Sequence, residues 1–225
     1  MATEIKTLVP EAVWGFFYDL TQIPRPTGHT LQAQEYVLAL AQRLGLKAER
    51  DAVGNVLVHK PASAGHENRP IVTLQAHLDM VPQKNNHIEH DFTRDPIDAY
   101  VDGEWVTARD TTLGADNGIG AAYAMAVLAD PTLVHGPIEC LFTIDEEVGM
   151  VGANGLQPGF CQGDILINLD SEDEGLLFAG CAGGQDVQVN LEYKDQEPVP
   201  EGDIAVRVSL TGLRGGHSGM DIILG

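Results

Sequence analysis

Three short apolar runs constrain the fold of this chain more than any other feature. They are PIVTLQA (70–76), PIECLFTI (137–144) and GDILINL (163–169). Continuous apolar runs of this length are expected of buried strands, and the last two are typical of central strands covered on both faces. Because helical patterns precede the first run and separate it from the second, the sequence predicts an α/β fold: a mixed, mainly parallel sheet flanked by helices.

The helical patterns lie at residues 10–22, 30–44 and 117–129. In the second, Thr30 is a candidate N-cap and Gly45 is expected to end the helix. A further strand is expected in GNVLVHK (54–60), and AYVDGEWV (99–106) predicts a hairpin with Asp102-Gly103 at its tight turn.

The pattern of apolar and polar residues changes near residue 184. QDVQVNLEY (185–193) and DIAVRVSLTGL (203–213) alternate apolar and polar residues, which predicts strands with one solvated face. We therefore expect a larger domain over 1–184 and the start of a smaller α+β domain over 185–225. Since residues 185–225 would form a poor core alone, we expect the 225 residues together to be the amino-terminal portion of a longer protein.

Charge limits the possible partners. The chain has 13 basic and 33 acidic residues, a formal net charge of −20, which disfavours binding to nucleic acid or to an anionic membrane. There is no signal-peptide pattern and no apolar run of about 18 residues, so a cytoplasmic location is expected. An excess of acids also suits the binding of multivalent cations.

Polar groups that bind metals follow each of the apolar runs. In open α/β sheets, ligands gather beyond the carboxyl ends of the strands, so we expect these groups to meet at one edge. A further acid stands at the start of the small-residue helix. The candidate residues are His77, Asp79, Asp116, Glu146, Glu147 and Asp170.

Five carboxylates in one place would repel one another, and two divalent cations would offset most of that charge. Mixed imidazole and carboxylate ligands suit zinc, with manganese or cobalt as substitutes. In an extended segment, the side chains of Glu146 and Glu147 would point to opposite sides. One is then expected to be a ligand and the other a general base.

Five ordered motifs resemble those of the di-zinc metallopeptidases, which include carboxypeptidases, tripeptidases and cytosolic dipeptidases. The motifs are HLDMV (77–81), TTLGADNGIG (111–120), DEEVG (145–149), NLDSED (168–173) and GGHSG (215–219). Longer strings such as LQAHLDMVPQKN and DGEWVTARDTTLGADNGIG are similar to bacterial aminoacyl-histidine dipeptidases. The resemblance implies a catalytic domain over 1–184 and the beginning of a lid or dimerisation domain over 185–225.

The resemblance also implies metal ligands. His77 and Asp170 would hold one zinc ion, Glu147 would hold the other, and Asp116 would bridge them. Members of the family take a further histidine for the second zinc from a late part of the chain, so the second site is expected to be incomplete here. These residues alone are then expected to show little turnover.

Three more roles follow from the same resemblance. Asp79 would orient the imidazole of His77, and Glu146 would act as general base and then pass its proton to the leaving amine. His217 would stabilise the oxyanion, in family members often within the site of a partner subunit. The implied enzyme is a zinc-dependent dipeptidase that hydrolyses small unblocked dipeptides, Xaa-His among them, and is a homodimer at full length.

Several alternatives stay open. A di-zinc deacylase (aminoacylase) or a tripeptidase of the same family would use the same metals. A glycosidase with paired carboxylates would need no metal, so its activity would survive a chelator. A non-catalytic module for metal storage or dimerisation, or an inactive metal-binding fragment, would bind cations without turnover.

Overall fold

A computed structural model of the chain describes residues 2–171, 173, 175–180, 183, 187–195, 197–212 and 223. The chain divides into two compact units, Met1–Leu176 and Leu177–Gly225. The helices and strands named below all lie in the first unit. The expected division into domains near residue 184 remains a prediction.

The first unit combines a larger sheet, a separate hairpin and several helices. The strands are β1 (Lys47–Arg50), β2 (Val56–Lys60), β3 (Val72–His77), β4 (Ala99–Asp102), β5 (Trp105–Ala108), β6 (Ile138–Thr143) and β7 (Ile165–Asn168). The α-helices are α1 (Glu11–Thr21), α2 (Leu31–Leu44), α3 (Ala115–Ala129) and α4 (Val151–Gly155). Two 3-10 helices, η1 (Ala2–Thr7) and η2 (Glu146–Val148), complete the unit.

The larger sheet is mixed, with strand order β1-β2-β6-β3-β7. β3 is parallel to both of its neighbours, with His77 opposite Thr143 of β6 and Gln75 opposite Asn168 of β7. β1 and β2 pair antiparallel, as do β2 and β6. Because β3, β6 and β7 run in the same direction, their carboxyl ends meet at one edge of the sheet, as the predicted mainly parallel sheet requires.

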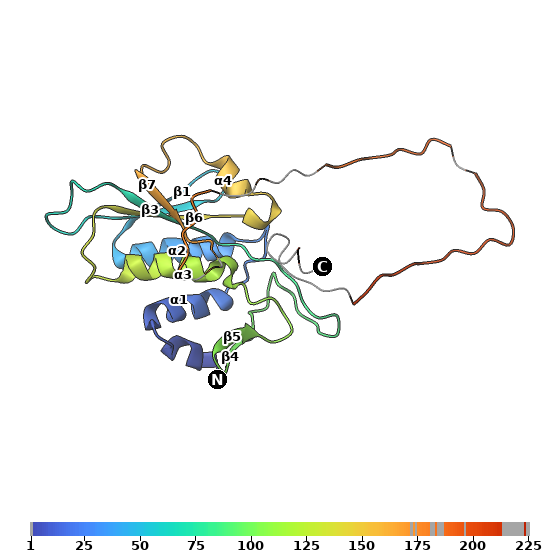
Figure 1. Cartoon of the computed structure of the whole chain (residues 1–225), viewed down its shortest axis with the longest axis horizontal. Coiled ribbons are helices and arrows are strands. Elements are labelled where there is room, and N and C mark those ends of the chain that lie inside the picture. Colours follow the sequence, from blue (N-terminus) through green and yellow to red (C-terminus); the bar gives the residue numbers. More distant parts are fainter. Residues whose placement is uncertain are drawn as a thin grey trace. The chain divides into compact units, whose positions relative to one another are not determined.

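Helices α2 and α3 cover one face of this sheet, and α1 packs against α3 on the side away from the sheet (Figure 1). The resulting core joins buried apolar side chains of both helices to those of the strands, among them Val37, Leu40, Val58, Met125 and Phe142. A second cluster holds α1 on α3 through Phe17 and Ala122. The expected flanking of the sheet by helices is confirmed.

The three predicted helices all form, with small differences at their ends. Thr30 stands at the N-cap of α2, but its hydroxyl makes no capping bond and instead accepts a hydrogen bond from the side chain of Gln34. Gly45 ends α2 in the left-handed conformation, with φ 68°, where glycine avoids the strain that a Cβ would bring. No helix among the described residues is long and apolar enough to cross a membrane.

The predicted hairpin forms with its turn shifted by one residue. Asp102 pairs with Trp105, so the turn consists of Gly103 and Glu104 rather than Asp102-Gly103. Gly103 has φ 61°, and a positive φ at the first turn residue is what a tight two-residue hairpin demands. Strand β1 was not predicted, because its residues KAER lack an apolar run.

The prediction of two central strands is right for β6 and wrong for β7. β6 lies between β2 and β3 and is almost wholly buried, whereas β7 forms the edge of the sheet made by the described residues. Ile165, Leu166 and Ile167 are 48%, 59% and 40% exposed. An apolar run shows that a strand is suited to burial, but it does not show what covers the strand.

The strands expected beyond residue 184 are not found in the part of that region that is described. The structure assigns neither helix nor strand to residues 187–195 and 197–212. Alternation of apolar and polar residues favours a strand with one solvated face, but a strand also needs a hydrogen-bonded neighbour. No partner strand lies among these residues.

Candidate metal centre

The candidate ligands meet at the carboxyl edge of β3, β6 and β7. His77 is the last residue of β3, and Asp170 lies two residues beyond β7. Glu146 and Glu147 begin η2, shortly after β6, and Asp116 lies in the first turn of α3. The register of the parallel strands therefore brings together residues that are widely separated in the sequence.

Two groups of side chains have donor atoms close enough to share a cation. In the first, one donor atom each of His77, Asp116 and Asp170 lies within 4.8 Å of the others. In the second, the same holds for His77, Glu146 and Glu147. His77 belongs to both groups, and its Nε2 lies 3.0 Å from Oδ1 of Asp116 and 3.8 Å from Oδ2 of Asp170.

The other ring nitrogen of His77 faces Asp79. Nδ1 lies 3.2 Å from Oδ1 of Asp79 and 3.1 Å from its backbone carbonyl oxygen. Both side chains are buried, so this contact fixes the imidazole plane and leaves Nε2 directed at Asp116 and Asp170. A carboxylate that holds one ring nitrogen of a histidine in this way sets the tautomer in which the other nitrogen is the ligand.

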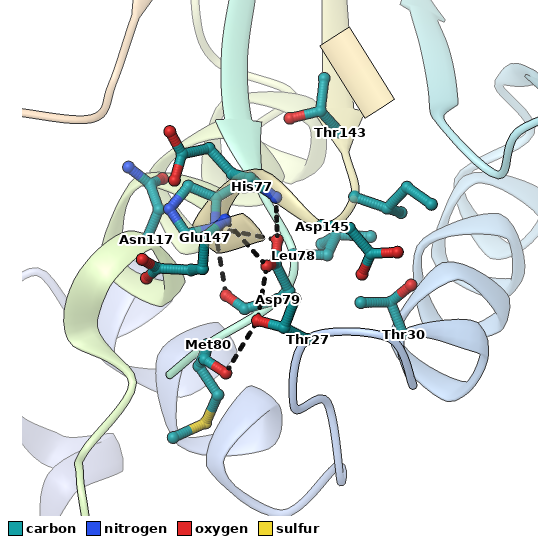
Figure 2. Close-up of polar contacts among 12 residues, drawn as sticks. Thr27, Thr30, His77, Leu78, Asp79, Met80, Asn117, Thr143, Asp145 and Glu147 are labelled. Atoms are coloured by element: carbon teal, nitrogen blue, oxygen red, sulfur yellow. Dashed lines mark hydrogen bonds and ion pairs between the residues drawn. The ribbon is translucent and has the colours of Figure 1, made fainter. Parts of the chain in front are cut away.

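Asp79 also ties the end of β3 to the segment that follows β6. Its carboxylate accepts hydrogen bonds from the backbone amides of Glu146, at 3.0 Å, and Glu147, at 3.3 Å. The hydroxyl of Thr27 donates a further bond of 2.9 Å, and Figure 2 shows these bonds converging on Asp79. Asp79 therefore positions both glutamates as well as His77.

The prediction that Glu146 and Glu147 lie in an extended segment is wrong. Asp145 has φ 50°, and residues 146–148 form a 3-10 turn. In this turn Glu146 and Glu147 each bring a carboxylate oxygen into the group around His77. Because the backbone turns, strand alternation gives no reason to assign them different roles. A difference in role remains a prediction from the resemblance.

Electrostatics show a site with an excess of negative charge. Burial and the neighbouring charge of Asp116 raise the pKa of Glu147 to about 7. Burial also raises the pKa of Glu146 and of Asp170. Burial opposes protonation of His77, but hydrogen bonds to Asp116 and Asp79 outweigh it and raise the pKa of His77 to about 10.

This donor set fits divalent cations. A cation at Nε2 of His77 would replace the proton that the surrounding acids now favour, and it would stabilise the ionised form of carboxylates whose pKa is raised. One imidazole together with several carboxylates is the ligand chemistry of zinc, manganese and cobalt sites.

Sequence reasoning missed Asn117, which holds one of the candidate ligands. Its Nδ2 donates hydrogen bonds to Oδ1 of Asp170, at 2.6 Å, and to the backbone carbonyl of Leu169, at 3.2 Å. Asn117 thereby links the start of α3 to the segment after β7. Its position directly after Asp116 is the only signal in the sequence. His217 lies outside the described residues, so the structure gives no information on its expected role.

Fold and site together define the class: an α/β protein with a candidate metal centre of the metallopeptidase kind at the carboxyl edge of its sheet. Residues 73–209 match the model of the family described as Peptidase family M20/M25/M40. The chain belongs to this family. The resemblance that the sequence motifs indicated is therefore confirmed.

The chain is also similar in sequence to an individual dipeptidase. The chain is 56% identical over 223 residues to the cytosol non-specific dipeptidase of Escherichia coli (strain K12), a match that covers 99% of this chain and 46% of that protein. It therefore spans about half the length of this relative.

Two solved structures have a similar fold. The crystal structure of aminoacylhistidine dipeptidase from Vibrio alginolyticus superimposes with a TM-score of 0.75 at 54% identity, over 78% of this chain and 36% of that one. A tripeptidase from Staphylococcus aureus gives a TM-score of 0.62 at 22% identity, over 72% and 44% of the two chains, and supports the fold alone.

Proposed function

We propose that this chain carries the metal centre of a zinc-dependent dipeptidase that hydrolyses small unblocked dipeptides, with those ending in histidine favoured. The observation that carries the proposal is the convergence of one imidazole and four carboxylates at a single sheet edge. Similarity to two dipeptidases, one named for the cytosol and one for aminoacyl-histidine, supports the substrate class and a cytoplasmic location.

In this proposal two cations share the site. His77 and Asp170 would hold one, Glu147 would hold the other, and Asp116 would bridge them, with the second site incomplete within these residues. Bound divalent cations supply Lewis-acid polarisation of the scissile carbonyl and lower the pKa of water. The donor group of His77, Asp116 and Asp170 supports the first of these two sites, and Glu147 lies in the other donor group, with His77 and Glu146.

Glu146 is the proposed general base. It would take a proton from the attacking water and return it to the leaving amine. Its raised pKa, caused first by burial, suits a group that must both accept and release a proton. Its backbone amide donates a hydrogen bond to Asp79, and its carboxylate lies in the donor group with His77 and Glu147.

Two further parts of the proposal concern residues beyond the described site. His217 would stabilise the oxyanion of the tetrahedral intermediate, and the full-length enzyme would act as a homodimer. The first comes from the resemblance of GGHSG (215–219) to the family motif, and the second from the resemblance to the family as a whole. The substrate is a small dipeptide, and the net charge of −20 gives no support to nucleic acid or an anionic membrane as a partner.

The test compares two substrates on the protein that carries this chain, with and without zinc. A dipeptide ending in histidine should be cleaved, cleavage should stop with a chelator and return with zinc, and an N-acetylated amino acid should be a poor substrate. Glu146→Gln should lower kcat by about 100-fold or more with zinc content unchanged. Preferred cleavage of the acetylated substrate would favour a deacylase instead. Activity that survives the chelator would exclude a metal-dependent dipeptidase and a metal-dependent deacylase alike.

A further inference from the structure

Arg25 is buried beside the candidate metal centre, and the site described above does not use it. It lies in IPRPTG (23–28), between α1 and α2, and is only 1% exposed. Its backbone runs alongside the end of β3: the amide of Met80 donates to the carbonyl of Arg25, and the amide of Thr27 donates to the carbonyl of Met80. These hydrogen bonds hold the backbone of Arg25 beside the end of β3.

The guanidinium joins two segments that carry candidate ligands. Nη1 donates to the backbone carbonyls of Leu78, at 2.9 Å, and Asp79, at 3.2 Å, directly after His77. Nη2 donates to the carbonyl of Gly114, directly before α3. One rigid, planar group thus spans the end of β3 and the start of α3.

Two glycines of the motif TTLGADNGIG make room for this group. A Cβ added to Gly114 would lie 2.6 Å from Nη2 of Arg25, and a Cβ added to Gly118 would also lie 2.6 Å from it. Gly114 has φ 73°, so its backbone requires glycine in any case. Gly118 has no such requirement, and a Cβ there would meet chiefly the guanidinium and, at 3.3 Å, the ring of Phe17.

A buried cation here also has an electrostatic effect. Burial lowers the pKa of Arg25 to about 10, and the charges of Asp79 and Asp116 partly offset that effect. The hydrogen bonds of its guanidinium go to the backbone carbonyls of Leu78, Asp79 and Gly114. Arg25 therefore adds positive charge behind the cluster without occupying a ligand.

We propose that Arg25 is a positioning residue of the metal centre, whose guanidinium holds the end of β3 and the start of α3 at the separation that lets His77 and Asp116 share a cation. The inference rests on the proposed metal centre. A residue that acts in this way should affect metal affinity and ligand geometry more than its effect on folding alone would explain.

The experiment measures cobalt binding by titration calorimetry and the visible absorption of the cobalt-loaded protein. The variants are Arg25→Met, Arg25→Lys and Gly118→Ala. Leu40→Ala is the control, because Leu40 is a buried core residue of α2 and is not a partner in the hydrogen bonds of Arg25. The thermal stability of each metal-free variant shows how much of any change follows from folding.

Arg25→Met and Gly118→Ala should raise the dissociation constant of cobalt about 10- to 100-fold and change its absorption spectrum. Leu40→Ala should lower stability and leave both unchanged. Arg25→Lys keeps the charge but cannot span both segments, so its dissociation constant for cobalt should lie between those of Arg25→Met and the unaltered protein. If Arg25→Met does not fold, Arg25→Lys is the deciding variant.

Two results would overturn the inference in distinguishable ways. Wild-type affinity and spectrum in Gly118→Ala and Arg25→Lys would reduce Arg25 to a core residue and leave the metal centre standing. Failure of the unaltered protein to bind cobalt would remove the metal centre itself, and the role of Arg25 with it.

Discussion

The Nε2 atom of His77 lies 3.0 Å from Oδ1 of Asp116, a residue 39 positions further along the chain. Hydrogen bonds to Asp116 and Asp79 raise the pKa of His77 to about 10 against the opposing effect of burial. The imidazole is therefore protonated at neutral pH in the metal-free protein. A cation that binds Nε2 must displace that proton.

Metal binding should consequently release protons. At pH 7.5 the calorimetric enthalpy of zinc binding should depend on the ionisation enthalpy of the buffer, and the slope should correspond to about one proton from His77 in addition to any released by the carboxyls. His77→Gln should lower this number by about one and weaken binding. An enthalpy that is the same in every buffer would contradict the arrangement.

Glu147 should make the stability of the metal-free protein depend on pH. Burial and the charge of Asp116 raise its pKa from 4.5 to about 7, so between these values the folded protein binds more protons than the unfolded chain. The free energy of unfolding should fall as pH rises through this window, and this contribution should be absent above it. Chemical denaturation at several pH values measures it.

Glu147→Gln is the matched variant for that measurement. Its free energy of unfolding should vary less between pH 5 and 7.5 than that of the unaltered protein, because the group that gains a proton on folding is gone. An equal pH dependence in the two proteins would show that Glu147 ionises normally in the fold.

Asp79→Asn should damage the centre although Asp79 is not a proposed ligand. The carboxylate accepts bonds from the amides of Glu146 and Glu147 and from Thr27, and an amide group would place an N–H donor against one of these donors. Zinc affinity should fall about 10- to 100-fold. Asp98→Asn is the control, because Asp98 is exposed and pairs with Arg109, an interaction that contributes about 0–1 kcal/mol.

Asn117→Asp should destabilise the metal-free protein above neutral pH. Asn117 now donates a 2.6 Å hydrogen bond to Asp170, and a carboxylate in its place would face Asp170 as a like charge. The melting temperature should fall at pH 8 and recover in part at pH 5.5, because repulsion between the two carboxylates favours protonation of one of them as the pH falls. Equal melting temperatures for variant and parent at pH 8 would argue against this contact.

Much of this arrangement could be predicted from the sequence because it depends on strand ends. The apolar runs before His77 and Glu146 identified β3 and β6, and parallel strands bring their carboxyl ends to one edge. The helices were found because apolar periodicity and Gly45 mark their length and end. These features are local, so the sequence displays them directly.

The contacts that fix the site could not be predicted in the same way. Arg25 and Gly114 are 89 residues apart, and Asn117 and Asp170 are 53 apart. Nothing in the local sequence marks these pairs, because they depend on how the segments pack. The 3-10 turn after Asp145 was missed for a related reason: the backbone amides of Glu146 and Glu147 are held by Asp79, which lies just beyond β3.

The most direct test of the metal centre is anomalous diffraction from crystals of the protein grown with zinc. We expect a peak at about 2.0–2.2 Å from Nε2 of His77 and from carboxylate oxygens of Asp116 and Asp170, with any second ion beside Glu147 and Asp116. Zinc bound elsewhere, with the side chains of His77, Asp116 and Asp170 unoccupied, would contradict it.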